Sequence, residues 1–374
     1  SYRHLRTTAP TGEPWSIHVL EVDRRARGIE IRAVGAVDEA GHMARGLPSA
    51  LGENEAAAVA VVNGDYDLPA PYLGVSDGLA VTSRRVWTTG RPGWPVMAIR
   101  GNGTPVINVP EVSLELKAGS RAWAIGALNK PLGSVHGRGP RGYTRDFRGK
   151  ISSNTPFQAI VIKNLSPGLP LQVDRRVRGE VVEVMESATE VAIPPDALVV
   201  VERRAPAAPG ESASKPVPPL VSLRQGDKVT LEIRIRVAGE NGIRDAVGGF
   251  PILVRGGQRD IVGAPSANLR QRHPRTAACY NREKIIFVVV DGRQPELSHG
   301  MTLEELADLM VSLGCEVAMN TDGGGSSVMA VALPAGGTNA PRDGGQRAAP
   351  LQIVNSPSDG RERGRGNAWV ILRR

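Results

Sequence analysis

The hydrophobic positions of this chain fall mostly in short runs separated by turn-forming residues. Alternation of apolar and polar side chains recurs, as in WSIHVLEVD at 15–23 and GDKVTLEIRIRV at 226–237. This period of two is typical of β-strands with one buried face. The 44 glycines and 29 prolines fit the pattern, because regular helices cannot hold so many of them. We therefore expect many short strands joined by turns.

One segment follows a different pattern. KIIFVVV at 284–290 is a continuous β-branched run, as expected of a strand buried on both faces. Residues 302–313 carry apolar side chains on one helical face, and Thr302 with Glu305 forms a capping box. EVAMN at 316–320 indicates a second buried strand. Strand, helix and strand in this order predict a βαβ unit with two parallel strands.

The predicted unit brings acidic residues together. Parallel strands end at the same edge of a sheet, which is where ligands bind in open α/β sheets. Asp291 follows the first strand and Asp322 follows the second. We therefore expect an α+β fold of β-rich mixed sheets, in which one βαβ unit carries the site.

The whole chain is expected to form one catalytic domain. Residues 1–130 would be its β-rich N-terminal part and residues 131–374 the remainder. Residues 205–219 (APAAPGESASKPVPP) are rich in Pro, Ala and Ser, a composition that does not pack. They predict a mobile loop between strands.

The charge of the chain points to anionic partners. The net charge is +8, and only seven of the 46 basic residues are lysines. Guanidinium groups suit carboxylate and phosphate recognition. Aromatic residues make up only 4% and no nucleic-acid motif is present, so we expect no nucleic-acid partner. We also expect no membrane span, because no apolar run approaches ~20 residues.

The only cysteines are Cys279 and Cys315, each in an apolar run. There is no CxxC pair, which argues against a zinc site. We expect both side chains to be buried as small hydrophobic groups. Whether they form a disulfide is left open.

The segment MNTDGGGSSVM at 319–329 places three glycines behind Asp322 and ahead of Ser326 and Ser327. It lacks the Gly-Lys-Ser/Thr ending of a Walker loop, the GxGxxG spacing and the ligand pattern of an EF-hand. Successive glycine N–H groups can converge on an anion or a sugar hydroxyl. A tight surface turn is the alternative, and the motif alone does not decide between them.

Together these stretches resemble the phosphodiester glycosidase family. The strongest match runs from Pro274 to Met329 and contains PRTA, DGR, a G-x-T helix start and N-x-DGGGSS. Further matches are NGDY at Asn63, SDG at Ser76, LNKP at Leu128, VGGFPILVRGG at Val247 and VNSPSDGRERGRGN ending at Asn367. The resemblance covers most of the chain, and the order and spacing of the stretches make it specific.

The resemblance implies hydrolysis of a sugar-1-phosphodiester on the glycosidic side, releasing a free sugar and a phosphomonoester. The setting would be glycan or cell-wall phosphopolymer processing by a secreted or periplasmic protein, with no nucleotide cofactor. We expect no cofactor and no metal in the reaction itself, and leave a structural metal open. The partner implied is the carbohydrate phosphodiester itself. The catalytic candidates are Asp322, Asp291 and Arg275. The substrate-binding candidates are Asn63, Asp65, Thr276, Arg293, Thr302, Asn320, Gly323, Gly324, Gly325 and Ser326.

Two positions depart from the family pattern. Asp65-Tyr66 stands where a glycine and an aromatic residue often follow Asn-Gly, and Thr321 replaces a usual leucine. These departures leave the identity of the sugar open.

The chemistry follows from the leaving group, a phosphate monoester anion that departs more easily than an alkoxide. Donors for its charge matter more than a strong general acid, and the glycine N–H groups with Arg275 or Arg293 would supply them. An oxocarbenium-like centre still needs a carboxylate as nucleophile or base, for which Asp322 and Asp291 are the candidates. Retention or inversion of configuration stays open.

Two other functions stay open. One is a glycoside hydrolase acting on ordinary linkages of an anionic glycan, which would need a carboxylic acid of raised pKa opposite the nucleophile. The other is a non-catalytic glycan-binding protein of the same fold. The intact Asp-Gly-Gly-Gly stretch favours an enzyme.

Overall fold

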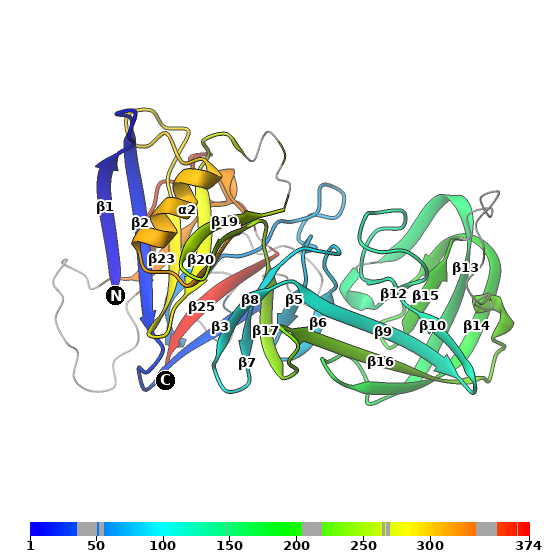
Figure 1. Cartoon of the computed structure of the whole chain (residues 1–374). Helices are drawn as coiled ribbons and strands as arrows, with labels where there is room; N and C mark the ends of the chain where they lie inside the picture. Colours follow the sequence, from blue (N-terminus) through cyan, green and yellow to red (C-terminus); the bar gives the residue numbers. More distant parts are fainter. Residues whose placement is uncertain are drawn as a thin grey trace. The chain divides into compact units, whose positions relative to one another are not determined.

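The protein is mostly β, with 53% strand and 7% helical residues. We describe a computed structural model (Figure 1). The residues described are 1–35, 51, 56–147, 149–203, 219–263, 266, 270–333, 350–364 and 366–374. The predicted α+β class is therefore wrong, because a single α-helix stands among several sheets in this part of the chain. The proposed loop at 205–219 lies outside the described residues except for Pro219.

The chain divides into two compact units that interleave along the sequence. The first comprises residues 1–78, 93–109 and 244–374, and the second residues 79–92 and 110–243. Elements of the first unit are β1 (Tyr2–Thr8), β2 (Pro14–Asp23), β3 (Ile29–Gly35), β4 (Ala58–Asn63), β7 (Val96–Arg100), β8 (Pro105–Asn108), β17 (Ile243–Gly248), β18 (Ile252–Arg255), β19 (Gln258–Val262), β20 (Arg275–Tyr280), β21 (Lys284–Val290), α2 (Leu303–Ser312), β22 (Val317–Asn320), the 3-10 turn η5 (Gly324–Ser326), β23 (Met329–Ala332), β24 (Leu351–Ile353) and β25 (Asn367–Arg373).

The second unit is built on one eight-stranded sheet in the order β10-β9-β16-β14-β13-β15-β12-β11. The alternation at 226–237 matches its strand β16, whose apolar side chains are buried on one face. Elements of this unit are β5 (Ala80–Thr82), β6 (Arg85–Thr88), β9 (Pro110–Ala118), β10 (Arg121–Ala124), β11 (Ala127–Leu128), β12 (Arg141–Tyr143), η3 (Arg145–Phe147), β13 (Lys150–Ser166), β14 (Arg176–Ala192), β15 (Leu198–Glu202), η4 (Leu220–Ser222) and β16 (Lys228–Val237).

Two sheets pack face to face in the first unit. One has seven strands in the order β1-β2-β21-β20-β22-β18-β19, and the other has five in the order β24-β23-β4-β25-β3. Phe287 and Met319 of the first sheet share a buried cluster with Val62 and Trp369 of the second. The opposite face of the seven-stranded sheet is covered by α2, whose Leu306 and Met310 are fully buried (Figure 1). Burial of these apolar side chains is the main stabilising term.

The predicted βαβ unit is also wrong in its pairing. Strands β21 and β22 lie in one sheet, but β20 runs between them and is antiparallel to both. The reason is local, because β20 and β21 form a hairpin around residues 281–283, closed by the hydrogen bond from Asn281 N to Lys284 O at 3.0 Å. That hairpin occupies the side of β21 that the prediction gave to β22.

The ends of β21 and β22 nevertheless reach the same edge of the sheet. Val290 pairs with Arg275 at the start of β20, and Asn320 pairs with Ala277 two residues further on. Asp291 and Asp322 thus leave the sheet on one side, flanking the N-terminal end of β20.

The helix itself begins as its sequence predicts. The Thr302 hydroxyl accepts a hydrogen bond from Glu305 N at 3.1 Å, and the Glu305 carboxylate accepts one from Thr302 N at 2.9 Å. Because this reciprocal pair satisfies two backbone donors, it fixes the start of α2. No helix among the described residues is long and apolar enough to cross a membrane.

Cys279 and Cys315 form a disulfide that joins β20 to the segment between α2 and β22. Both residues are buried, as expected, at 0% and 1% exposure. The bond cross-links positions 36 residues apart, so it restricts the unfolded chain around the whole strand–helix segment.

We expect the double variant Cys279→Ala/Cys315→Ala to lose about 3–4 kcal/mol of unfolding free energy, the value for a loop of this length. Urea unfolding followed by fluorescence measures the loss. Reduced wild-type protein is the matched control, since it keeps both sulfur atoms and lacks only the bond. A difference below about 1 kcal/mol would show that the disulfide does not constrain the unfolded chain.

Candidate active site

The side-chain amide of Asn63 holds the site together from the end of β4. Its Nδ2 donates to the backbone oxygen of Asp322 at 2.8 Å. Its Oδ1 accepts from Thr276 Oγ1 at 2.9 Å and from Val328 N at 3.0 Å. Asn63 and Thr276 are each 1% exposed. These two predicted substrate-binding residues therefore hold each other and position the loop that carries Asp322.

The glycine run packs tightly against its neighbours. A Cβ atom on Gly323 would lie 2.8 Å from Pro274 O, and one on Gly324 would lie 3.3 Å from the Arg293 guanidinium. Gly324 also has φ +63°, a left-handed backbone that favours glycine. Close approach of these segments explains why side chains are missing here.

Several N–H groups of this loop already have partners inside the protein. Gly324 N donates to Pro274 O at 2.8 Å, Ser326 N to Gly323 O at 3.1 Å and Asp322 N to Gly64 O at 3.1 Å. Ser326 is itself buried, at 4% exposure. Since these N–H groups donate inside the protein, close packing explains much of why glycines stand here. Anion binding by the glycine loop stays a prediction.

Asp322 lies near Tyr66. Its side chain is partly exposed, whereas Asn320 two residues earlier is completely buried. The Tyr66 hydroxyl accepts from Asn320 Nδ2 at 2.7 Å and donates to Phe250 O at 3.1 Å. Burial first, and then the negative charge of Asp322, raise the pKa of Tyr66 far above its ordinary value. Tyr66 therefore stays a neutral phenol next to a carboxylate.

Arg275 is held by the backbone. Its Nε donates to Met301 O at 2.8 Å and its guanidinium to Gln271 O at 2.5 Å, and the residue is only 2% exposed. Burial is the main cause that lowers the pKa of Arg275 to about 10, and the nearby charge of Arg293 acts in the same direction. The guanidinium still carries its charge at neutral pH, but it lies under the site and not on its surface.

Arg293 is the exposed guanidinium of the site. It stands beside the backbone of Gly324, and its terminal nitrogen lies 3.2 Å from Nδ1 of His273. Its own backbone has φ +58°, which is uncommon for a residue with a side chain. Such conformations cluster at functional positions, and this one directs attention to Arg293.

Asp65 organises a neighbouring loop. Its carboxylate accepts hydrogen bonds from Ser76 Oγ and, at 2.6 Å, from Gly78 N, and its backbone N–H donates to Asn367 Oδ1 at 2.8 Å. A Cβ atom on Gly78 or on Gly248 would press against this carboxylate. With 1% exposure, Asp65 joins four sequence motifs in space and is not open to solvent. Thr302, another predicted binding residue, caps α2 as described above.

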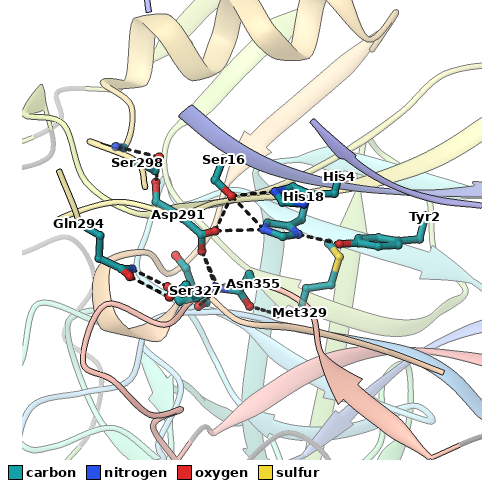
Figure 2. A network of polar contacts seen from close by, with 12 residues as sticks. Tyr2, His4, Ser16, His18, Asp291, Gln294, Ser298, Ser327, Met329 and Asn355 are labelled. Carbon is teal, nitrogen blue, oxygen red and sulfur yellow. Dashed lines mark hydrogen bonds and ion pairs between the residues drawn. The ribbon is translucent and has the colours of Figure 1, made fainter. Parts of the chain in front are cut away.

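Asp291 is the centre of a buried polar network (Figure 2). Its Oδ2 accepts from Ser16 Oγ at 2.8 Å and lies 3.0 Å from His18 Nε2. His18 in turn contacts the Tyr2 hydroxyl through Nδ1 at 2.8 Å. Asp291 and His18 are each 1% exposed. The N-terminal hairpin β1–β2 is thereby attached to the end of β21.

The other oxygen of Asp291 faces the C-terminal part of the chain. Oδ1 accepts from Ser356 N at 2.8 Å and from Asn355 Nδ2 at 3.2 Å. Asn355 also donates to Ser327 O at 3.1 Å, so the network reaches the end of the glycine loop (Figure 2). Both carboxylate oxygens are thus engaged inside the protein, which is the arrangement of a positioning residue.

The sequence analysis missed His18, Ser16, Tyr66 and Asn355. In WSIHVLEVD, Ser16 and His18 occupy the same strand face as Leu20 and Val22, which enter the core. Polar side chains on a core-facing stripe signal a buried polar network and could have been noticed. Within the described residues, no group of three or more His, Cys, Asp or Glu side chains is arranged to hold a metal ion.

The network predicts how stability depends on pH. Burial alone would raise the pKa of Asp291, but the hydrogen bond and charge of His18, then the donors Ser16 and Ser356, outweigh it and hold the pKa below its ordinary value. A lowered folded-state pKa stabilises the protein above the ordinary pKa, and this stabilisation is lost as the pH falls below about 4.

We expect Asp291→Asn to lower the unfolding free energy at neutral pH by about 3 kcal/mol, the lower end for breaking a buried ion pair. The difference in unfolding free energy from wild type should begin to narrow below about pH 4, where the unfolded wild-type chain takes up a proton at Asp291, and should close only at lower pH, where the folded carboxylate is protonated too. Urea unfolding across this range measures it. The surface variant Asp308→Asn is the control. If the difference in unfolding free energy between wild type and Asp291→Asn stayed constant with pH, the lowered pKa of Asp291 would be contradicted.

Comparison with known proteins shows which family the chain belongs to. The phosphodiester glycosidase family model matches residues 173–372, more than half of the chain. No curated protein matches the sequence. Among solved structures, a hypothetical protein from Synechocystis has a TM-score of 0.72 at 17% identity, covering 100% of this chain and 62% of its own. This chain therefore spans less than two thirds of that protein.

Two further structures are similar. A putative exported protein from Burkholderia pseudomallei has a TM-score of 0.67 at 22% identity, covering 97% of this chain and 75% of its own. The catalytic domain of zebrafish N-acetylglucosamine-1-phosphodiester α-N-acetylglucosaminidase has a TM-score of 0.47 at 14% identity, covering 100% and 83%. The Synechocystis and Burkholderia structures share the fold, and the family match identifies this chain as a member of the phosphodiester glycosidase family.

Proposed function

We propose that this protein hydrolyses a sugar-1-phosphodiester on the glycosidic side, with Asp322 as the reacting carboxylate. The observation that carries the proposal is the placement of Asp322 at the sheet edge. It is the partly exposed acid there, near the neutral phenol of Tyr66, and it precedes Gly323, which approaches the backbone of Pro274 and Arg275. Membership of the phosphodiester glycosidase family supports the same reaction class.

The reaction breaks the bond between the anomeric carbon and the phosphate oxygen. The phosphomonoester departs with the electron pair, and water supplies the hydroxyl group of the released sugar. Asp322 would stabilise the positive charge at the anomeric carbon, either by attacking it or by activating the water. Arg293, exposed beside the glycine turn, would bind the departing phosphate.

The low pKa of Asp291 bears on the alternative activity. Cleavage of an ordinary glycosidic bond needs a carboxylic acid that keeps its proton near neutral pH. The pKa of Asp291 is lowered and both its oxygens accept hydrogen bonds inside the protein, so Asp291 does not fit that role. A phosphate leaving group needs no such proton, so this feature favours the phosphodiester.

The compartment is part of the same proposal. The Cys279–Cys315 disulfide fits an oxidising environment such as the periplasm or the cell exterior. We propose that the protein is exported. Cell fractionation checks this, and recovery of the reduced protein from the cytoplasm would contradict it.

We expect Asp322→Asn to abolish turnover of sugar-1-phosphodiesters, by at least about a thousandfold in kcat, while the melting temperature stays close to wild type. The substitution keeps the shape and removes the charge. Asp308→Asn, on the exposed face of α2, is the control and should keep full activity. An Asp322→Asn enzyme of full activity would remove Asp322 from the mechanism.

We expect Arg293→Ala to raise KM for a sugar-1-phosphodiester by about tenfold to a hundredfold, the range for losing a charge-assisted contact. A neutral aryl glycoside that the enzyme also cleaves should be affected much less. Arg259→Ala removes an exposed arginine that pairs with Asp308 and serves as the control. Equal losses on both substrates would mean that Arg293 does not bind phosphate.

A further inference from the structure

Arginine side chains are concentrated on three short segments of the first unit, which we call the arginine patch. The segments are residues 23–28 between β2 and β3, residues 281–283 between β20 and β21, and residues 373–374 at the end of β25. They contain only two acids, Asp23 and Glu283, against six arginines, an excess of four positive side-chain charges. This excess is half of the net charge of +8 of the whole chain. The six are Arg24, Arg25, Arg27, Arg282, Arg373 and Arg374.

Hydrogen bonds hold the three segments together. Arg24 N donates to Glu283 O at 2.8 Å, and Nη1 of Arg24 donates to Asn281 O at 2.7 Å. On the other side, Arg374 N donates to Gly28 O at 2.8 Å. Figure 1 shows the end of the chain beside the blue turn between β2 and β3. Residues 23–28 therefore lie between the other two segments, and the arginines share one region of the surface.

Two of the six guanidinium groups are engaged within the fold. Arg24 donates to two backbone carbonyls, and Arg374 pairs with Glu30 at 2.7 Å. The other four arginines are exposed and make no side-chain hydrogen bond or ion pair with the described residues: Arg25, Arg27, Arg282 and Arg373. Four charged donors of the patch are therefore available to a ligand.

The chemistry of these groups favours a ligand with repeated negative charges. Neighbouring guanidinium groups repel one another, and no pairing within the described residues offsets this repulsion. Arg259 differs, because it is also exposed but pairs with Asp308. A planar guanidinium binds phosphate oxygens through two hydrogen bonds, and several arginines on one surface match the repeated charges of a polyanion.

The composition of the patch argues against two other kinds of partner. None of its three segments contains an aromatic residue, so the bases of a single-stranded nucleic acid would find no ring to stack on. None of the exposed large apolar side chains among the described residues lies in these segments either. Proteins that bind a membrane surface commonly insert such side chains between the lipids. A water-soluble polyanion fits the patch better.

The patch and the candidate active site lie at opposite ends of one strand. The patch adjoins Lys284 at the start of β21, whereas Asp291 follows the last residue of that strand. Seven residues of extended chain span about 20 Å. A ligand bound at the patch therefore leaves the candidate active site open, and a polymer must be longer than this distance to contact both.

We propose that the arginine patch binds a linear polymer of phosphate or phosphodiester groups, as a second binding site apart from Asp322. The choice of phosphate over carboxylate rests on the proposed function, because the substrate named there carries phosphate. A polymer held at the patch has a raised effective concentration at the candidate active site of the same unit. The binding itself needs no turnover, so it is measured independently of the reaction.

The test measures binding of long-chain inorganic polyphosphate to the intact protein by isothermal titration calorimetry at several salt concentrations. The variant Arg25→Ala/Arg27→Ala/Arg282→Ala removes three of the four unpaired arginines of the patch. The variant Arg25→Lys/Arg27→Lys/Arg282→Lys keeps the charge at the same positions.

The matched control is Arg138→Ala/Arg145→Ala/Arg178→Ala in the second unit. These three arginines are likewise exposed and make no side-chain hydrogen bond or ion pair with the described residues. The control therefore changes the net charge by the same amount and leaves the patch intact.

We expect the patch alanine variant to bind polyphosphate about tenfold to a hundredfold more weakly near ~50 mM salt, because three phosphate contacts are lost. The slope of log Kd against log salt should fall by about two, since each contact contributes about 0.7. The lysine variant should keep most of the binding, and the control should stay within about twofold of wild type. Melting temperatures close to wild type are expected, because all six positions are exposed.

An equal loss of binding in the patch alanine variant and in the control would show that net charge alone attracts polyphosphate, and would reject the patch. A patch-dependent preference for polygalacturonate, single-stranded DNA or phosphatidylglycerol vesicles over polyphosphate would reject the phosphate polymer as its ligand. Patch-dependent binding in a protein that does not cleave sugar-1-phosphodiesters keeps the patch and rejects the proposed reaction. Cleavage without patch-dependent binding keeps the reaction and rejects the patch.

Discussion

The site depends above all on one buried amide. Asn63 ends a strand of the five-stranded sheet, and its side chain bonds Asp322 of one loop, Thr276 of the opposite sheet and Val328 beyond the glycines. A buried amide left without these partners would cost about 1–3 kcal/mol for each unsatisfied group. The same contacts that join the two packed sheets at their edge therefore fix the position of Asp322.

At the edge of the seven-stranded sheet, residues of the same type differ in burial and therefore in what they contact. Asp291 and Asp322 follow equivalent strand ends, yet Asp291 is enclosed by donors while Asp322 is partly exposed. The arginines divide in the same way, since Arg275 is bonded to backbone carbonyls and Arg293 is open to solvent. In each pair the buried member is hydrogen-bonded inside the protein, and the other member is reached by solvent.

The sequence predicted what depends on local pattern. The capping box at Thr302, the helix and the strand ends before Asp291 and Asp322 all follow from periodicity and turn chemistry. It did not predict that β20 would lie between β21 and β22, because the apolar pattern of a strand does not specify which strands pair with it. Nor could it assign Asp291, whose partners Ser16 and His18 lie more than 270 residues away in the chain.

The glycine run shows why the distant contacts matter. Glycine normally costs about 0.5–1 kcal/mol against alanine in regular structure, and three in a row add to the disorder lost on folding. Here Pro274, Arg293 and Asp359 occupy the space that side chains at positions 323–325 would need. A Cβ atom at position 323 would lie 2.8 Å from Pro274 O, just before β20, so glycine lets the loop approach that strand. In this position Asp322 N donates to Gly64 O and Asp322 O accepts from Asn63. The glycines thus help to set the position of Asp322, whether or not their N–H groups ever bind an anion.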